Sequence, residues 1–177
     1  MNLVLIGYRG TGKSAVAEIL SQKLGMPAVS LDEEIVREAG MPIPQIVETH
    51  GWPWFRDLES ETTQRFAARD GLILDTGGGV ILRHENAESL RRGGALFWLK
   101  ASVGVIVERI RESRERPSLT EGQSFLEEVA QVLAERLPLY QAAADREIDT
   151  DALSATEVAD VILREFRALS AERGHRA

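Results

Sequence analysis

Short apolar runs alternate with amphipathic stretches along the whole of this chain. Runs that are apolar on both faces, such as Leu3-Val4-Leu5-Ile6, are typical of strands buried inside a parallel sheet. Stretches with apolar residues three and four positions apart are typical of helices that cover such a sheet. The pattern predicts strands at residues 2–6, 27–30, 72–75 and 95–99, with a short fifth strand at 147–150.

Helices are predicted between these strands and after the last of them. Gly25 follows the first helix as a stop signal, and Ser154 with Glu157 forms a capping box at the start of the last. Pro138 is expected to break the helix that begins at Phe125. The predicted helices cover residues 13–24, 31–40, 41–51, 52–68, 84–92, 103–111, 125–137 and 154–169.

This alternation of strand and helix predicts an α/β fold, with a parallel sheet covered on both faces. No repeat or linker interrupts the chain, so residues 1–170 are expected to form one domain, with 171–177 as a frayed tail. Ligands of such sheets bind at the carboxyl ends of the strands. The polar segment at residues 112–124, which contains Pro117 and Gly122, is the predicted mobile lid over that edge.

The amino-acid composition limits which classes of protein this chain can belong to. Hydrophobic residues make up 44% of the 177 residues, which suits a globular domain with a sizeable core. Acidic residues outnumber basic ones by 28 to 21, and the net charge of −7 argues against nucleic-acid binding. The chain has no cysteine, no apolar run of membrane-spanning length and no basic signal-peptide segment at its start. We therefore expect a monomeric, cytoplasmic protein that contacts neither membrane nor nucleic acid.

The strand at residues 2–6 leads into Gly7-Tyr8-Arg9-Gly10-Thr11-Gly12-Lys13-Ser14, which fits the phosphate-binding pattern G-x-x-x-x-G-K-[ST]. Its glycines let backbone N–H groups turn toward phosphate oxygens, and the following helix adds the positive end of its dipole. Lys13 supplies a charge for the outer phosphates and Ser14 a hydroxyl for Mg²⁺. The predicted nucleotide contacts in this loop are Gly10, Thr11, Gly12, Lys13, Ser14 and Ala15.

Further motifs follow at the predicted strand ends and on the helices. They are Asp32, Phe55-Arg56-Asp57-Leu58-Glu59, Gly77-Gly78-Gly79, Arg116-Pro117 and Arg136-Leu137-Pro138-Leu139-Tyr140. In this order and with these spacings they resemble the shikimate kinase family, and the resemblance extends from Leu3 to about Phe166. Apart from the phosphate-binding loop, each motif alone is weak; together they are specific.

The resemblance implies both a fold and an activity. The fold would be the three-layer P-loop kinase fold of nucleoside monophosphate kinases, with a five-stranded parallel sheet in the order 2-3-1-4-5. Residues of about 33–60 would form the substrate-binding region. The activity would be transfer of the γ-phosphoryl group of ATP, with Mg²⁺, to the 3-hydroxyl of shikimate, on the route to chorismate and the aromatic amino acids. ATP and shikimate would be the small-molecule partners.

The same resemblance assigns roles to individual residues. Arg56 and Arg136 would grip the carboxylate of shikimate, a group that guanidinium binds through paired hydrogen bonds. Asp32 would orient the attacking hydroxyl and accept its proton. The predicted catalytic residues are Lys13, Asp32 and Arg116, further ATP contacts are Arg109 and Arg116, and the predicted substrate contacts are Asp32, Arg56, Gly77, Gly78, Gly79 and Arg136.

Several of these residues have ordinary structural alternatives. Arg56 and Glu59 are three positions apart, so they can simply pair on the surface of a helix. Asp32 stands where a helix begins and can serve as its cap or first-turn acid. Trp52 and Trp54 stand where the family usually has polar or small residues. They either pack under the substrate-binding region or form a ring wall for the substrate.

Ser30 is the main departure from the family pattern. The family has Asp-x-Asp where this chain has Ser30-Leu31-Asp32, so the first acid, which lies near Mg²⁺, is missing. Asp75 ends the neighbouring strand, just before the glycines, where the family often has a small residue. We hypothesise that Asp75, acting through water beside Ser14, replaces the lost acid. The alternative is that Asp75 only shapes the turn.

Two other functions stay open from the sequence. One is a different small-molecule kinase of the same fold, such as a gluconate-type or nucleotide kinase; Arg56 with Arg136 favours an acceptor with a carboxylate, and the motif from Arg136 to Tyr140 is not expected in those kinases. The other is a non-catalytic nucleotide-binding paralogue. Ser30 favours that interpretation. The residues that oppose it are the intact Lys13, Ser14, Asp32 and Arg116.

Overall fold

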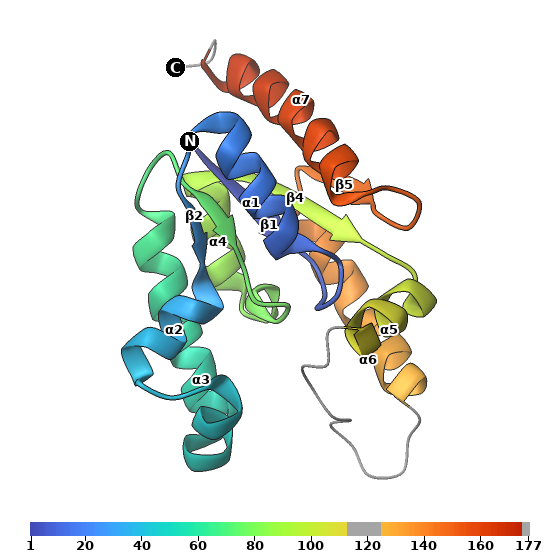
Figure 1. The fold of residues 1–177 in the computed structure, drawn as a ribbon. Helices are drawn as coiled ribbons and strands as arrows, with labels where there is room; N and C mark the ends of the chain where they lie inside the picture. Colours follow the sequence, from blue (N-terminus) through green and yellow to red (C-terminus); the bar gives the residue numbers. More distant parts are fainter. Residues whose placement is uncertain (113–124, 175–177) are drawn as a thin grey trace.

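Five parallel strands form the centre of the structure, a computed structural model that describes residues 1–112 and 125–174 (Figure 1). The strands lie in the order β2-β3-β1-β4-β5, which confirms the fold class and the strand order expected from the sequence. The central strand β1 pairs in parallel with β3 on one side and with β4 on the other. The strand bounds are β1 Asn2–Ile6, β2 Ala28–Ser30, β3 Ile73–Asp75, β4 Gly94–Lys100 and β5 Arg146–Asp149.

Helices cover both faces of the sheet (Figure 1). Because side chains alternate along a strand, Leu3 and Leu5 of β1 face α1 and α7, whereas Val4 and Ile6 face α4 and parts of α3 and α6. Two apolar cores result, one on each face. The helix bounds are α1 Lys13–Leu24, α2 Leu31–Ala39, α3 Ile43–Ala67, α4 His84–Gly93, α5 Val103–Glu112, α6 Phe125–Ala143 and α7 Ala155–Gly174, with a 3₁₀ turn, η1, at Val80–Leu82.

Helices α2 and α3 form an arm beside the sheet (Figure 1). At Gly51 the backbone leaves the helical region, with φ 83° and ψ 166°, so α3 consists of two segments. This matches the two helical pieces that the sequence predicts around Gly51. Pro53 lies in the first turn of the second segment, where its missing N–H is tolerated. A separate apolar cluster that includes Ile35, Ile46 and Phe55 joins α2 to both segments.

Two helix ends differ from the sequence prediction. The helix that was expected to break at Pro138 continues through it to Ala143. A proline inside a helix costs about 3 kcal/mol, and the core packing of Tyr140 and Ala143, which are 0% and 3% exposed, offsets that cost. Helix α7 reaches Gly174, so residues 171–174, which were expected to be frayed, are helical.

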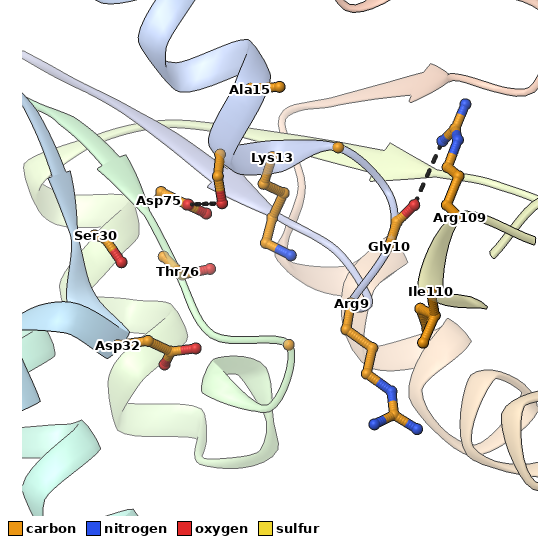
Figure 2. A pocket seen from close by; sticks show the side chains of 13 residues that line it. Arg9, Gly10, Lys13, Ala15, Ser30, Asp32, Asp75, Thr76, Arg109 and Ile110 are labelled. Carbon is orange, nitrogen blue, oxygen red and sulfur yellow. Dashed lines mark hydrogen bonds between the residues drawn. The ribbon is translucent and has the colours of Figure 1, made fainter. Parts of the chain in front are cut away.

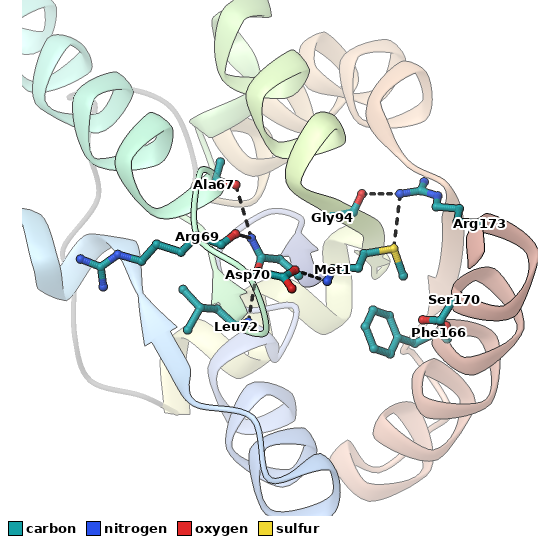
Figure 3. Close-up of polar contacts among 10 residues, drawn as sticks. Met1, Ala67, Arg69, Asp70, Leu72, Gly94, Phe166, Ser170 and Arg173 are labelled. Atoms are coloured by element: carbon teal, nitrogen blue, oxygen red, sulfur yellow. Dashed lines mark hydrogen bonds and ion pairs between the residues drawn. The ribbon is translucent and has the colours of Figure 1, made fainter. Parts of the chain in front are cut away.

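Hydrogen bonds join the amino ends of β1 and β4 to neighbouring segments (Figure 3). The side-chain amide of Asn2 donates to the carbonyl oxygen of Arg69 at 2.8 Å, and its oxygen accepts from the N–H of Leu72 at 3.0 Å. The Arg173 guanidinium of α7 donates to the carbonyl oxygen of Gly94 at 2.8 Å. These bonds tie the loop after α3 and the end of α7 to the sheet. Within the part of the chain that the structure describes, no helix has the length and apolar character needed to cross a bilayer.

Candidate functional site

A cavity of about 460 Å³ opens at the carboxyl ends of β1, β2 and β3 (Figure 2). The loop after β1 forms one wall, and the residues that follow β2 and end β3 form the opposite wall. This is the edge of the sheet at which the sequence predicts ligand binding. The lining residues are Arg9, Gly10, Gly12, Lys13, Ser14, Ala15, Ser30, Asp32, Asp75, Thr76, Gly78, Arg109 and Ile110.

The loop after β1 has the backbone geometry of a phosphate-binding loop. Gly10 and Gly12 have φ angles of 79° and 90°, a left-handed conformation that favours glycine. Helix α1 begins directly afterwards, so its unpaired first-turn N–H groups lie at the cavity, as does Ala15. Thr11 differs from its neighbours because it does not line the cavity. Its hydroxyl donates instead to the carbonyl oxygen of Tyr8, at 2.8 Å.

The Lys13 ammonium group is hydrogen-bonded to the backbone of this loop. It donates to the carbonyl oxygens of Gly7 and Tyr8 at 2.9 and 3.1 Å. Burial lowers the pKa of Lys13, while the negative charges of Asp75 and Asp32 act in the opposite direction. The side chain therefore lies in the cavity wall with replaceable partners, and phosphate oxygens are stronger acceptors than the carbonyls it now binds.

Asp75 lies where the hypothesis of an exchanged acid requires it. The Ser14 hydroxyl donates to Asp75 Oδ2 at 2.6 Å (Figure 2). Asp75 ends β3 in register with Ser30 of β2, and all three side chains line the cavity. Burial raises the pKa of Asp75, against the charge of Lys13 and the hydrogen bond from Ser14. The metal hypothesis and the alternative that Asp75 only shapes the turn both stay open, and the bond to Ser14 places the carboxylate beside the start of α1.

Hydroxyl and carboxylate oxygens are the donors that Mg²⁺ prefers, so Ser14 and Asp75 fit that ion. Among residues 1–112 and 125–174, no group of three or more His, Cys, Asp or Glu side chains could by itself hold a metal. Ser30 has a different task in the structure: it caps α2 by accepting from the N–H of Glu33 at 3.3 Å. Asp32 is therefore not the cap, and lies in the first turn of α2.

The glycine loop at residues 77–79 passes between charged side chains. A Cβ on Gly77 would lie 2.6 Å from Asp32 Oδ1 and 3.1 Å from Glu59 Oε1. A Cβ on Gly79 would lie 2.4 Å from both terminal nitrogens of Arg56. These separations are too short for any larger residue without displacement of its neighbours. The loop thus brings α2 and α3 side chains against the end of β3, and a Cβ at Gly77 or Gly79 would displace the side chain of Asp32 or Arg56.

Arg56 both pairs on its helix and reaches the glycine loop. Its Nη1 donates to Glu59 Oε2 at 2.5 Å, and the rings of Trp52 and Phe55 lie 5.3 and 5.1 Å from its guanidinium carbon. Glu59 is 2% exposed, and its other oxygen, Oε1, has no hydrogen-bond partner. Burial raises the pKa of Glu59, although the Arg56 charge opposes this. The helix pair and the proposed substrate contact are therefore compatible roles of Arg56.

Arg136 approaches the same loop from α6. Its Nη1 donates to the carbonyl oxygen of Gly78 at 2.9 Å, and its guanidinium lies 5.7 Å from the centre of the Tyr8 ring. The predicted substrate residues Arg56 and Arg136, which are far apart in the sequence, therefore meet at residues 77–79. Two guanidinium groups beside one backbone loop can bind an anionic group that contacts the loop N–H groups.

Arg109 lies at the other side of the phosphate-binding loop, in the wall of the cavity. Its guanidinium donates to the hydroxyl and the carbonyl oxygen of Thr150 at 3.0 and 2.8 Å, and more weakly to the carbonyl oxygen of Gly10 at 3.5 Å. It thus joins α5 to the segment after β5 and to the loop. The predicted contact Arg116 and the predicted lid, apart from Glu112 at the end of α5, lie outside the described residues.

Arg9 is a lining residue that the sequence analysis did not single out. Its Nε and Nη2 are buried without a hydrogen bond, and Nη2 lies 3.8 Å from a carboxylate oxygen of Glu128 on α6. Its guanidinium also lies over the rings of Tyr8 and Phe125, at 5.7 and 5.4 Å. The phosphate-loop pattern leaves this position open to any residue, so the motif offers no signal for it.

The tryptophans are more exposed than the packing interpretation expects. Trp52 and Trp54 are 50% and 38% exposed, so neither lies in the core. Trp52 lies against Arg56, whereas Trp54 stacks on His50 with ring centres 4.3 Å apart. Trp52 thus lies in contact with a predicted substrate residue.

Comparisons with known proteins point to one family. The family model described as shikimate kinase matches residues 9–167 of the chain. The chain is 40% identical to a shikimate kinase of Thermodesulfovibrio yellowstonii over 169 residues, an overlap that covers 96% of each protein. It is 41% identical to a shikimate kinase of Nitratidesulfovibrio vulgaris over 160 residues, which covers 89% of this chain and 91% of that protein.

Solved structures extend the likeness to the fold. A shikimate kinase from Acinetobacter baumannii in complex with shikimate matches with a TM-score of 0.88 at 32% identity, over 94% of this chain and 93% of that one. A gluconokinase from Sinorhizobium meliloti matches with a TM-score of 0.64 at 22% identity, over 99% of this chain and 97% of that one. The second likeness shows a shared fold alone.

The raised pKa of Asp75 makes a prediction for stability. Because folding favours the protonated acid, the cost of ionising Asp75 appears as pH rises from its ordinary value of 3.8 through the higher folded pKa. Asn at this position has no charge to bury. We therefore expect Asp75→Asn to raise Tm, relative to wild type, more at pH 7 than at pH 4, as measured by thermal unfolding.

The surface change Asp160→Asn, which also removes a carboxylate, is the control for general charge effects; Asp160 pairs with Lys23 at an exposed position. A gain in Tm from Asp75→Asn that is greater at pH 4 than at pH 7 would contradict the prediction.

Proposed function

The chain belongs to the shikimate kinase family, and we propose that it transfers the γ-phosphoryl group of ATP to the 3-hydroxyl of shikimate, in chorismate and aromatic amino-acid biosynthesis. The observation that supports this best is the meeting of Arg56 and Arg136 at residues 77–79, beside a phosphate-binding loop. A carboxylate-bearing acceptor and a nucleotide can then bind side by side.

The nucleotide would bind in the cavity at the start of α1. Backbone N–H groups of the loop and the helix terminus suit its phosphates, and Lys13 would exchange its two carbonyl partners for phosphate oxygens. Arg109 would border the nucleotide from α5. Arg116 belongs to the proposal through the family resemblance; an arginine that reaches the transferring phosphoryl group contributes on the order of 10³-fold to turnover.

Asp32 would act on the acceptor. Its carboxylate lines the cavity next to Gly77, where it can accept a hydrogen bond from the 3-hydroxyl and then its proton. As the new bond forms between that oxygen and the γ-phosphorus, the bond from the γ-phosphorus to the bridging oxygen of ADP breaks. Lys13 stays near the phosphates and offsets the charge that this oxygen gains.

Mg²⁺ fits the oxygen donors at the end of β3. Ser14 would hold the ion directly and Asp75 through water, with the Ser30 hydroxyl on the same wall as a further water contact. The ion, when bound with ATP, neutralises charge on the phosphates. The proposal also includes a cytoplasmic monomer whose partners are small molecules, in keeping with the net charge of −7.

Shikimate should be the phosphoryl acceptor. Purified protein with ATP and Mg²⁺ is expected to release ADP rapidly only when shikimate is added, because the two arginines select a carboxylate on a compact ring. Coupled measurement of ADP release checks this, with gluconate and nucleoside monophosphates as control acceptors. ATP hydrolysis that ignores shikimate, or faster turnover with gluconate, would sink the proposal and favour one of the two rival functions.

Gly79→Ala should weaken shikimate binding selectively. The φ and ψ of Gly79, −104° and 2°, suit alanine, but the new Cβ would meet the Arg56 guanidinium at 2.4 Å and displace it. We expect KM for shikimate to rise at least tenfold, which corresponds to about 1.4 kcal/mol, with KM for ATP little changed. Steady-state kinetics with each substrate varied measures the two values.

Gly104→Ala is the matched control, because nothing lies within 4 Å of a Cβ at that helical position. It should leave both KM values unchanged. An equal rise in the two KM values of Gly79→Ala would show that the substitution disturbs the whole site and would count against the role of Arg56.

An exchange of side chains tests the metal proposal. Asp75→Ser should raise the Mg²⁺ concentration needed for half-maximal activity and lower turnover strongly, since Ser14 would lose its charged neighbour. Because Ser30 lies in register with Asp75 on the same wall, adding Ser30→Asp should restore part of both quantities. The measurement is activity against Mg²⁺ concentration at fixed ATP. An unchanged Mg²⁺ dependence in Asp75→Ser would mean that Asp75 has no part in holding the metal.

A further inference from the structure

Tyr140 is a polar member of the Arg136–Tyr140 motif that has no role in the reaction proposed above. It lies on α6 with no exposed surface. Its hydroxyl donates to the carbonyl oxygen of Gly78 at 2.6 Å. Its ring stacks on Trp98 of β4, with ring centres 5.6 Å apart and an interplanar angle of 14°. The stacked ring and the hydrogen-bonded hydroxyl fix this buried phenol in place. Its hydroxyl is therefore a fixed hydrogen-bond donor to the middle residue of the glycine loop.

The carbonyl of Gly78 decides where the next N–H group points. A peptide unit is planar and trans, so its C=O and N–H bonds point in opposite directions. Tyr140 and Arg136 both hold the Gly78 oxygen on the side of α6, at 2.6 and 2.9 Å. The N–H of Gly79 is therefore directed away from α6. Three glycines in succession are free to adopt other peptide orientations, so this orientation needs an external cause.

The two donors to Gly78 differ in what happens when an acceptor binds. A carbonyl oxygen has two lone pairs, and Tyr140 and Arg136 can occupy both. Arg136 would give up its present contact with Gly78 if the guanidinium turned to face a substrate carboxylate, because a paired bond to a carboxylate fixes the direction of its N–H groups. Without Tyr140 that part-buried carbonyl would lose both of its protein partners when Arg136 turned, which costs hydrogen-bond free energy.

We propose that Tyr140 is a positioning residue for the acceptor: its hydroxyl holds the Gly78–Gly79 peptide so that Arg136 and the loop N–H groups are presented together to the acceptor's carboxylate. This inference rests on the proposed function, since it concerns how the same site binds its acceptor. It assigns the hydroxyl, and not the ring, to substrate affinity.

The surroundings of Tyr140 keep its hydroxyl a donor. Burial raises the pKa of Tyr140 to about 12, and the nearby acidic groups of Tyr8 and Glu59 act in the same direction, whereas the Arg136 guanidinium acts against it. The hydroxyl therefore stays protonated through the range in which enzymes of this kind work. The Trp98 ring prevents the phenol from turning away from Gly78.

Tyr140→Phe tests the inference, because it removes the hydroxyl and keeps the stacked ring. We expect KM for shikimate to rise roughly fivefold to tenfold, the range of one hydrogen bond. The value of kcat and KM for ATP should stay within about twofold, because a contact made equally in the ground and transition states changes KM alone. Calorimetric titration with shikimate, without nucleotide, should show Kd rising by the same factor.

Ser21→Ala is the matched control. It also removes a hydroxyl that donates to a backbone carbonyl, that of Met26 at 2.7 Å, but at the far end of α1. It should lower Tm slightly, as Tyr140→Phe does, and leave the affinity for shikimate unchanged. A variant Tyr140→Phe with lower Tm and wild-type affinity for shikimate would show a merely structural role and overturn the inference.

A lower kcat together with similar rises in KM for ATP and KM for shikimate would overturn it too, because the hydroxyl would then support the whole fold and not the acceptor site. The two proposals fail separately. If the wild-type protein does not phosphorylate shikimate, the proposed function is contradicted. If it does, but the Tyr140→Phe variant binds shikimate with the same affinity as wild type, only the role of Tyr140 is contradicted.

Discussion

The register of β3 between β2 and β1 is the constraint on which the site depends. Asp75 is opposite Leu5 of β1 on one side and Ser30 of β2 on the other, so the carboxyl ends of the three strands are aligned at the same edge of the sheet. A slip of one residue would exchange the two faces of the strand and bury Asp75 among apolar side chains. Because Leu74 is held in the core, Asp75 is directed to Ser14 and its charge lies near Lys13.

Much of this arrangement is readable from the sequence, because local patterns determine it. The apolar runs gave the strands, and Gly12-Lys13-Ser14 located the loop that lines the cavity, since both depend on neighbours in the chain. The path of α6 through Pro138 was missed, because the burial of Tyr140 that offsets the proline is a tertiary effect. The meeting of Arg56 and Arg136 came from the family resemblance, since no local pattern brings two distant helices together.

Guanidinium groups around the site rest on aromatic rings as well as on hydrogen-bond acceptors. Arg56 lies on Trp52, and the Tyr8 ring lies near both Arg9 and Arg136. A ring face attracts a cation without using its N–H groups. Those N–H groups then stay able to bind an anion, which explains why buried nitrogens of Arg9 without a hydrogen bond are tolerable. The exposed tryptophan that sequence patterns could not interpret is part of this arrangement.

Helix α6 touches both halves of the site. Its first turns meet Arg9 of the phosphate loop through Phe125 and Glu128, and its later turns meet the glycine loop through Arg136 and Tyr140. At 19 residues it is a rod about 28 Å long. A displacement along its axis alters the donor and acceptor contacts together. Any change that one bound substrate makes in the affinity for the other through α6 must be matched by an equal change in the reverse direction.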